Sequence, residues 1–288
     1  MTARRGLRFA ALSYLALLLI VPVGLVVYRT FQPGIGEVWD SITTPAATSA
    51  FWLTLEIAAI SVVLNTVLGV LTALLLVRGR FRGKWAMEAL LDLPFAVSPV
   101  VVGLSLVLVY GRGGWLADLP FQVIFALPGM VLATVFVSLP FVAREVIPVL
   151  REVGDEQEQA AATLGASGWQ TFRRITLPAI RWGVAYGVIL STARAIGEFG
   201  AVSVVSGKVA GETVTMTLLV ENRFQNFDLA GAYAASALLA LIALSTLLAM
   251  TLLRPRRDDA GSPSTPSTSA SATTRRCRTS RSRCPRAH

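Results

Sequence analysis

The sequence from residue 52 to residue 77 reads WLTLEIAAISVVLNTVLGVLTALLLV, and Glu56 is its one charged residue. At 1.5 Å per helical residue, a stretch of this length can cross a hydrocarbon layer about 30 Å thick. Residues 52–77 therefore predict a transmembrane helix, with a lipid bilayer as the solvent of the chain.

The composition of the whole chain favours the same solvent. Of the 288 residues, 54% are hydrophobic and only 15% are charged, which is more apolar surface than one soluble core could bury. The net charge of +9 could suggest a nucleic-acid partner, but residues 255–288 hold eight arginines and two aspartates and so carry most of it. We therefore expect membrane lipid, and no nucleic acid, as a partner.

Six stretches of the chain are long and apolar enough to span a membrane. They are residues 9–28, 52–77, 86–110, 121–143, 182–206 and 229–253. The first has no small-x-small cleavage site before the turn at Gln32, Pro33 and Gly34, so we interpret it as a helix and not as a signal peptide. The predicted fold is an all-α membrane protein with six transmembrane helices.

Basic residues set the expected orientation, because short loops rich in Lys and Arg stay in the cytoplasm. Such residues cluster at 4–8, 78–84, 144–181 and 254–257, whereas the alternate loops hold only Arg29, Arg112, Lys208 and Arg223. The pattern predicts a multi-pass protein of the inner membrane with both termini in the cytoplasm. Residues 1–50 then form the first helix and a periplasmic loop, and residues 51–253 form the main transmembrane domain.

The segment 254–288 is rich in Ser, Thr, Pro and Arg and poor in apolar residues, so we predict a disordered cytoplasmic tail. Its Cys277 and Cys284 match no common metal-ligand spacing, and we expect no metal site. His288 is the single histidine of the chain, so we expect no histidine-based catalytic site.

The segment 155–178 carries strong local signals for a pair of short helices. Asp155 and Glu158 have the spacing of a capping box at the start of the first helix. Gly165 suits the left-handed residue that ends this helix.

The second short helix of this segment has its own start and stop signals. Ser167 and Gln170 form another capping-box pattern, and Leu177 and Pro178 are expected to end the helix. The segment therefore predicts a helix, a glycine break and a second helix.

The same segment contains a spaced motif. Its residues are Gln159, Ala160, Ala161, Gly165, Ile175, Leu177 and Pro178. The spacing closely resembles the E-A-A-x3-G-x9-I-x-L-P motif of ATP-binding-cassette importer permeases. The resemblance implies that residues 155–178 are the coupling segment, which docks in a groove of a cytoplasmic ATPase. Gln159 replaces the first glutamate of the motif and can offer only a weaker, neutral hydrogen bond. The alternative is an ordinary amphipathic hairpin on the membrane surface.

The resemblance covers about residues 50–253. Residues 92–101 and 193–202 resemble the sulfate and molybdate permeases, and residues 203–213 resemble the W-type subunits of sulfate and thiosulfate importers. The resemblance implies the transmembrane domain of a type I importer, which works with a T-type permease, a sulfate-type ATPase dimer and a periplasmic sulfate-binding protein. It also implies a non-catalytic subunit that binds no cofactor, since ATP and Mg²⁺ belong to the ATPase. A molybdate or tungstate permease is the alternative.

A possible solute pathway involves charges and prolines inside the predicted helices. Arg194 and Glu198 are four residues apart and face the same side of a helix, and a charge at the centre of a membrane costs about 2.5–3.5 kcal/mol. They form either a neutralised packing pair or a site at which Arg194 attracts a dianion. Pro94 and Pro99 interrupt the helix 86–110, which either lines a pathway or simply curves.

Two other classes of function find less support in the sequence. A proton-coupled secondary transporter favours inverted repeats with paired carboxylates inside the membrane, and the six spans show no such symmetry. A membrane enzyme needs a nucleophile with a base or clustered acids, which the sequence does not display. It also lacks a phosphate-binding loop of the form G-x4-G-K-[ST].

Overall fold

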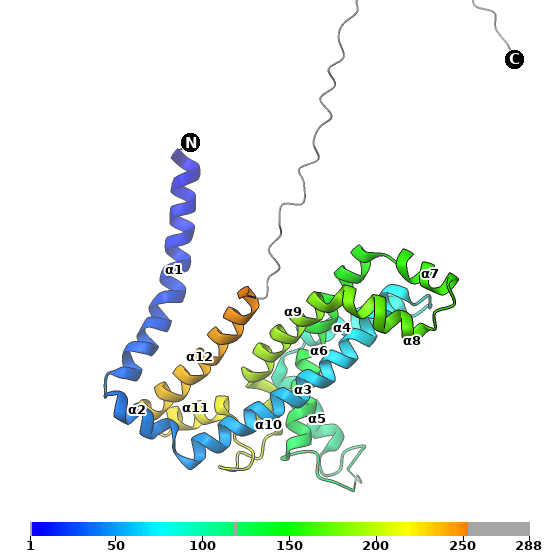
Figure 1. The fold of residues 1–288 in the computed structure, drawn as a ribbon. Coiled ribbons are helices and arrows are strands. Elements are labelled where there is room, and N and C mark those ends of the chain that lie inside the picture. Colours follow the sequence, from blue (N-terminus) through cyan, green and yellow to red (C-terminus); the bar gives the residue numbers. More distant parts are fainter. Residues whose placement is uncertain (1, 118–119, 253–288) are drawn as a thin grey trace, which may run out of the picture. The chain divides into compact units, whose positions relative to one another are not determined.

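The structure, a computed structural model, describes residues 2–117 and 120–252. All regular elements in these two ranges are helical, as predicted. They are α1 (Thr2–Phe31), α2 (Ile35–Ile42), α3 (Pro45–Arg78), α4 (Lys84–Ala96), α5 (Pro99–Tyr110), α6 (Leu127–Val153), α7 (Glu156–Thr163), α8 (Gly168–Thr171), the π-helical turn η1 (Phe172–Thr176), α9 (Leu177–Ile196), α10 (Gly200–Val205), α11 (Met216–Gln225) and α12 (Leu229–Leu252) (Figure 1). The predicted tail 254–288 and the last residue of the predicted helix 229–253 lie outside the described residues.

Five of the described helices are long and apolar enough to cross a membrane, or six spans if α4 and α5 count as one. Residues 86–110, predicted as one span that Pro94 and Pro99 interrupt, form two helices, because α4 and α5 meet at an angle of 109°. The break lies at Val97 and Ser98. Proline disfavours helical backbone in the residue before it, and Ser98 is extended, with φ −61° and ψ 135°. Pro99 then starts α5, where its missing N–H costs nothing.

Two more predicted spans have different limits in the structure. Residues 121–126 are not helical, and α6 begins at Leu127 with Pro128 in its first turn. The predicted helix 182–206 is two helices, because α9 ends at Ile196 and α10 begins at Gly200. Between them, the side chain of Glu198 accepts a hydrogen bond from the Ala201 N–H, one of the N–H groups at the start of α10 that have no partner within the helix.

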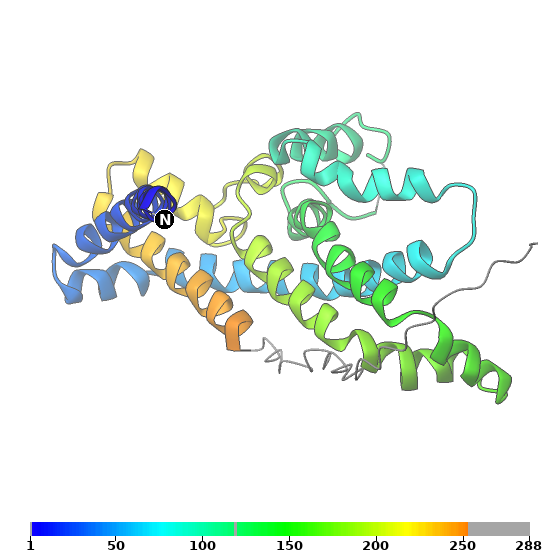
Figure 2. The ribbon, with the colours of Figure 1, turned by 90° about the horizontal axis from the view of Figure 1, so that it is seen from above.

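Helices α3, α6 and α9 lie side by side (Figures 1 and 2) and meet at Val142. A β-carbon on Gly69 of α3 would lie 2.7 Å from Val142 Cβ, and one on Gly187 of α9 would lie 2.7 Å from Val142 Cα. Val142 itself is fully buried. Glycine on both sides lets the three backbones approach closely, as small residues do in membrane helices.

A buried polar contact joins two of these helices one turn away. The Asn65 amide of α3 donates a hydrogen bond to Ser138 Oγ of α6, with an N–O distance of 2.8 Å, and both residues are at most 1% exposed. Ser138 Oγ in turn donates to the Thr134 carbonyl oxygen. Such hydrogen bonds fix the register of two apolar helices where dispersion alone is not directional.

The packing at Val142 predicts opposite effects for the same substitution at two glycines. Gly187→Ala is expected to lower the free energy of unfolding by about 1–3 kcal/mol, because its methyl group overpacks the contact. Gly24→Ala in α1 is the matched control, since nothing lies within 4 Å of a β-carbon there and alanine favours a helix over glycine. Thermal unfolding of the detergent-solubilised variants measures both. Equal melting temperatures for the two variants would contradict the packing argument.

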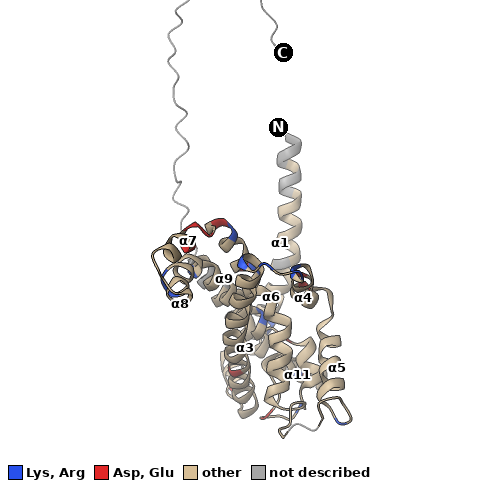
Figure 3. Ribbon diagram, turned by 90° about the vertical axis from the view of Figure 1, so that its right-hand side faces the viewer, with Lys and Arg blue, Asp and Glu red and all other residues tan. Residues whose placement is uncertain are grey.

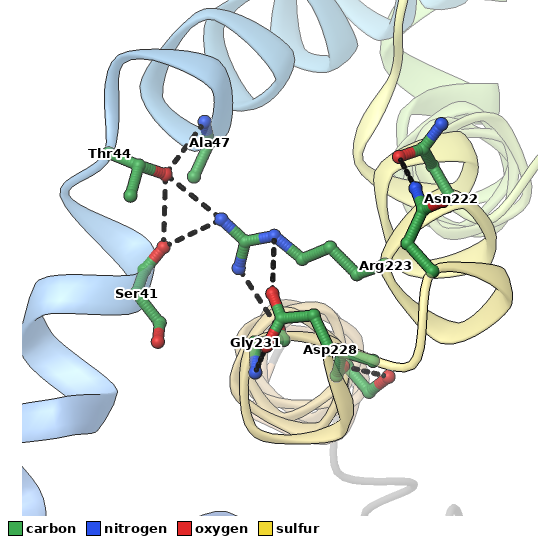
Figure 4. A network of polar contacts seen from close by, with 10 residues as sticks. Ser41, Thr44, Ala47, Asn222, Arg223, Asp228 and Gly231 are labelled. Atoms are coloured by element: carbon green, nitrogen blue, oxygen red, sulfur yellow. Dashed lines mark hydrogen bonds and ion pairs between the residues drawn. The ribbon is translucent and has the colours of Figure 1, made fainter.

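Arg223 of α11 joins three elements near the start of α12 (Figure 4). Its Nη2 donates hydrogen bonds to the Ser41 carbonyl oxygen (3.0 Å) and to Thr44 Oγ1 (2.9 Å), and its Nη1 donates to the Gly231 carbonyl oxygen (3.1 Å). Its Nε lies 3.8 Å from Asp228 Oδ2. The side chain is only 11% exposed, so these contacts fix the corner between α2 and α3 against α11 and α12.

Candidate functional site

The chain between α6 and α9 folds into two short helical pieces, which we call the 154–176 hairpin. Its first helix, α7, ends in a Schellman motif. Gly165 has a φ of +81°, its N–H donates to the Ala162 carbonyl oxygen, and the Ala166 N–H donates to the Ala161 carbonyl oxygen, each with an N–O distance of 3.0 Å. The predicted glycine break is confirmed.

The predicted capping box at the start of α7 is wrong. Asp155 is the N-cap residue, but its side chain accepts no hydrogen bond from the helix backbone. Instead, the Gln159 amide donates to Asp155 Oδ2 at 2.8 Å, and Glu158 turns toward Arg78, whose Nε lies 2.9 Å from Glu158 Oε2. A guanidinium in this position is a stronger partner for a carboxylate than a backbone N–H.

The second half of the hairpin starts as predicted but does not end as predicted. Ser167 and Gln170 form the expected capping box. The helix does not stop at Leu177 and Pro178, because α8 continues through the π-helical turn η1 directly into α9. The Leu177 N–H bonds to the Phe172 carbonyl oxygen, five residues back. This wider turn lets the chain continue past Pro178, which lacks an N–H of its own.

The motif residues lie in the hairpin and in the first two positions of α9, and they differ in exposure. Gln159, Ala160, Gly165, Leu177 and Pro178 are exposed, and Ala161 and Ile175 are partly buried. Two bulky apolar side chains accompany them on the outside, since Leu164 is 88% exposed and Trp169 is 69% exposed. Figure 3 shows charged residues gathered around α7 and α8, while the long helices are mostly free of them. Apolar side chains within such a charged rim are typical of a protein-binding surface.

Hydrogen bonds among Arg78, Gly154, Glu158 and Thr176 hold this hairpin to the end of α3. We call this set of contacts the clasp. Arg78 binds Glu158 through two nitrogens, with Nε–Oε2 and Nη2–Oε1 distances of 2.9 Å and 3.2 Å. Its Nη2 also donates to the Gly154 carbonyl oxygen, and Thr176 Oγ1 donates to Glu158 Oε1 at 2.9 Å. Sequence reasoning missed Arg78 and Thr176, because the local pattern around Glu158 gives no sign of a partner so far away in the chain.

The Arg194–Glu198 pair lies where α9 breaks. Arg194 Nη1 and Glu198 Oε2 form an ion pair, in which the side chain of Glu198 is 2% exposed and that of Arg194 is 31% exposed. Glu198 Oε1 accepts a hydrogen bond from the Ala201 N–H (2.9 Å), and the Glu198 carbonyl oxygen accepts one from Thr217 Oγ1 (2.9 Å). The carboxylate thus neutralises Arg194 and starts α10 at the same time.

The two helix breaks lie next to each other. A β-carbon on Gly200 of α10 would lie 3.0 Å from Pro99 Cβ, and one on Gly103 of α5 would lie 2.7 Å from the Ala201 carbonyl oxygen. Pro94 is buried inside α4 and Pro99 begins α5, so only Pro99 sits at the break. The structure brings Pro99 and Glu198 to neighbouring breaks, and a pathway role for these residues and for Arg194 stays a prediction.

Two further ion pairs join α4 to α6. Arg144 pairs with Asp92 and lies over the ring of Phe95, 5.0 Å from its centroid. Arg151 Nη2 lies 3.6 Å from Glu88 Oε1. The side chains of both pairs are about half exposed, at 50% and 53% in the first and 60% and 48% in the second, and such exposed pairs stabilise a protein little.

Comparison with known proteins places this geometry in a family. Residues 65–259 match the family described as "Binding-protein-dependent transport system inner membrane component". The chain is 50% identical over 233 residues to the sulfate transport system permease protein CysW of Synechocystis sp., covering 80% of this chain and 84% of that protein. It is 38% identical over 233 residues to the CysT permease protein of Escherichia coli, again covering 80% and 84%.

A solved structure shares the fold. The bacterial alginate ABC transporter, in complex with its alginate pentasaccharide-bound periplasmic protein, has a chain that superposes with a TM-score of 0.72. The match has 18% identity and covers 88% of this chain and 96% of that chain. The all-helical fold is thus that of type I importer permeases. From the family match and the identity to its members, the chain belongs to the binding-protein-dependent transport system inner membrane components, the permeases of ATP-binding-cassette importers.

Proposed function

We propose that the chain is a permease subunit of an ATP-driven sulfate importer. The proposal of sulfate as the substrate rests on the 50% identity to a CysW sulfate permease over most of both chains. The subunit forms the translocation pathway together with a T-type permease, which the similarity to CysT supports. Its sulfate or thiosulfate is delivered by a periplasmic sulfate-binding protein.

The energy for transport comes from a separate sulfate-type ATPase dimer, which holds the ATP and Mg²⁺, while this chain binds no cofactor and catalyses no reaction. The 154–176 hairpin supports this division of roles. Its motif residues Gln159, Ala160 and Gly165 are exposed beside Leu164 and Trp169, so a groove in a soluble partner can receive them. The importer then alternates between outward and inward access as the ATPase dimer closes and opens.

The proposed location is the inner membrane, with both termini and the hairpin in the cytoplasm. Exposed apolar side chains run along the long helices, as at Leu17 and Val21 of α1 and at Val63 and Val67 of α3. Lipid or another membrane helix is the natural cover for such surfaces. The basic clusters at 78–84 and at the hairpin support the orientation.

Uptake of radiolabelled sulfate tests the substrate. The chain, expressed with its three partners in a strain that lacks a sulfate permease, is expected to restore sulfate accumulation because it completes the pathway. An ATPase subunit without its catalytic glutamate is the control and is expected to abolish uptake. Restored molybdate or tungstate uptake without sulfate uptake would favour the alternative substrate.

Association with the ATPase tests the class of transporter. A cysteine in place of Ala161 is expected to cross-link to the ATPase, because Ala161 lies on the partly exposed α7. A matched cysteine at Gly24 of α1 is expected not to cross-link to it. Transport by the purified chain alone under a proton gradient would overturn the proposal in favour of a secondary transporter.

A further inference from the structure

The clasp between α3 and the 154–176 hairpin is the most enclosed ion pair among those that the structure describes at this end of the molecule. The Arg78 and Glu158 side chains are 23% and 22% exposed, against about half for the pairs between α4 and α6. Two parallel N–O contacts join the guanidinium to the carboxylate. This two-point geometry fixes an angle as well as a distance.

Each member of the clasp belongs to a different element. Arg78 is the last residue of α3, Glu158 lies in α7, Thr176 ends η1, and Gly154 is the turn that follows α6. Thr176 is 5% exposed and fills the unspecified position of the motif between Ile175 and Leu177. The clasp thus connects the first and last residues of the hairpin, Gly154 and Thr176, to each other and to the end of α3 through Arg78 and Glu158.

Without the clasp, α7 would have weak connections to the transmembrane helices. It contacts α8 and η1, which belong to the same hairpin, and it follows α6 through Gly154, which has a φ of +69°. A single left-handed glycine leaves the direction of the next helix poorly fixed. The Arg78–Glu158 contact supplies a fixed link between α7 and a long helix.

The clasp also separates the roles of two neighbouring side chains. Gln159 bonds to Asp155 within the hairpin and is exposed, whereas Glu158 points to Arg78 and Thr176. The ionised side chain therefore holds the hairpin to the membrane helices, and the neutral side chain at the first motif position faces outward. The substitution of glutamine in the motif leaves this internal link intact.

We propose that Arg78 and Glu158 are positioning residues for energy coupling, which lock α7 to α3 so that a displacement of the 154–176 hairpin moves α3 together with α9. This inference rests on the proposed function, because it assumes that an ATPase displaces the hairpin. Thr176 supports the same lock by holding Glu158 in place. The hairpin then acts on two long helices of the group that meets at Val142, and not on α9 alone.

The first test measures sulfate transported per ATP hydrolysed by the complete importer, reconstituted in vesicles with both permeases, the ATPase and the binding protein. Glu158→Ala is expected to keep ATPase binding and hydrolysis while sulfate per ATP falls about fivefold, near the lower end of typical coupling between sites. The double variant Arg78→Glu, Glu158→Arg restores an ion pair and is expected to recover part of the ratio. Glu88→Ala, which removes the exposed pair with Arg151, is the matched control and should leave the ratio unchanged.

The second test does not depend on transport. Spin labels on cysteines at Leu75 of α3 and Gln157 of α7, with Cys277 and Cys284 replaced by serine, report the distance between the two helices in the full chain. Both positions are exposed, so the labels do not disturb the core. We expect one narrow distance distribution, which broadens with Glu158→Ala and stays narrow with Glu88→Ala.

The outcomes separate this inference from the proposed function. An unchanged sulfate-to-ATP ratio in Glu158→Ala, or a parallel loss of assembled complex and transport at constant ratio, overturns the positioning role. An unaltered distance distribution in Glu158→Ala overturns the lock itself. If the parent complex transports no sulfate but the distance distribution broadens with Glu158→Ala, then the proposed function is wrong, and the link between α7 and α3 is still supported.

Discussion

Replacing Glu198 with leucine is expected to lower the free energy of unfolding by about 3–5 kcal/mol, the usual cost of breaking a buried ion pair. Glu198 is 3% exposed, and its carboxylate both neutralises Arg194 and accepts the Ala201 N–H that begins α10. The variant leaves the Arg194 guanidinium without its counter-charge in a helix that is a candidate membrane span. The amount of monodisperse protein extracted from membranes and its melting temperature measure the loss.

A double variant separates packing from transport at the same site. Arg194→Met combined with Glu198→Leu removes both charges and is expected to recover most of the lost stability, since apolar replacements of a whole pair are often neutral. If Arg194 only balances Glu198, sulfate uptake returns with stability. If Arg194 attracts the dianion, uptake stays low in a stable protein. A Glu198→Leu variant as stable as the parent would contradict the role of the pair in both cases.

Gly165→Val is expected to lower sulfate uptake about tenfold or more while leaving the amount of protein in the membrane unchanged. A left-handed backbone costs an ordinary L residue about 1–2 kcal/mol, which is a factor of about ten in a conformational equilibrium, and Gly165 has a φ of +81°. The strain is purely conformational, because nothing lies within 4 Å of a β-carbon there. Valine therefore unwinds the Schellman motif and changes the angle between α7 and α8, so the hairpin no longer presents one fixed surface to the proposed ATPase partner.

Asparagine at the same position provides the control for this prediction. Gly165→Asn is expected to keep most of the uptake, because asparagine tolerates the left-handed region far better than a β-branched residue. Uptake assays and copurification of the ATPase, made side by side on both variants, distinguish a conformational effect from a loss of the glycine itself. Equal uptake by the valine and asparagine variants would rule out the conformational explanation.

The local signals of the 154–176 hairpin could be predicted because they act within a few residues. The left-handed glycine at 165 and the capping box of Ser167 and Gln170 need no distant partner, and the structure contains both. The capping box expected at Asp155 does not form, because its Glu158 has a partner that is distant in the chain. Arg78, at the end of another helix, offers Glu158 a stronger bond than the local backbone does.

The two broken spans could not be predicted from hydropathy, which averages over a window and does not register a change of direction. The apolar run 86–110 continues through the break at Val97 and Ser98, and either Pro94 or Pro99 could have caused it. Pro94 stays inside α4, since a kinked helix can accommodate proline when its neighbours satisfy the freed carbonyl. At Glu198 the break is accompanied by a hydrogen bond from Thr217, 19 residues further along the chain, which a window of apolar residues does not encode.

The contacts that Arg223 makes with α2, α3 and α12 tolerate substitutions of its partners better than a substitution of Arg223 itself. Two of its acceptors, the carbonyl oxygens of Ser41 and Gly231, belong to the main chain and survive almost any replacement of those residues. Thr44 and Asp228 each supply a single side-chain contact, so losing one leaves the others in place. Loss of Arg223 removes all of them at once. The corner between α2 and α3 therefore has several alternative hydrogen-bond acceptors but depends on one donor side chain, that of Arg223.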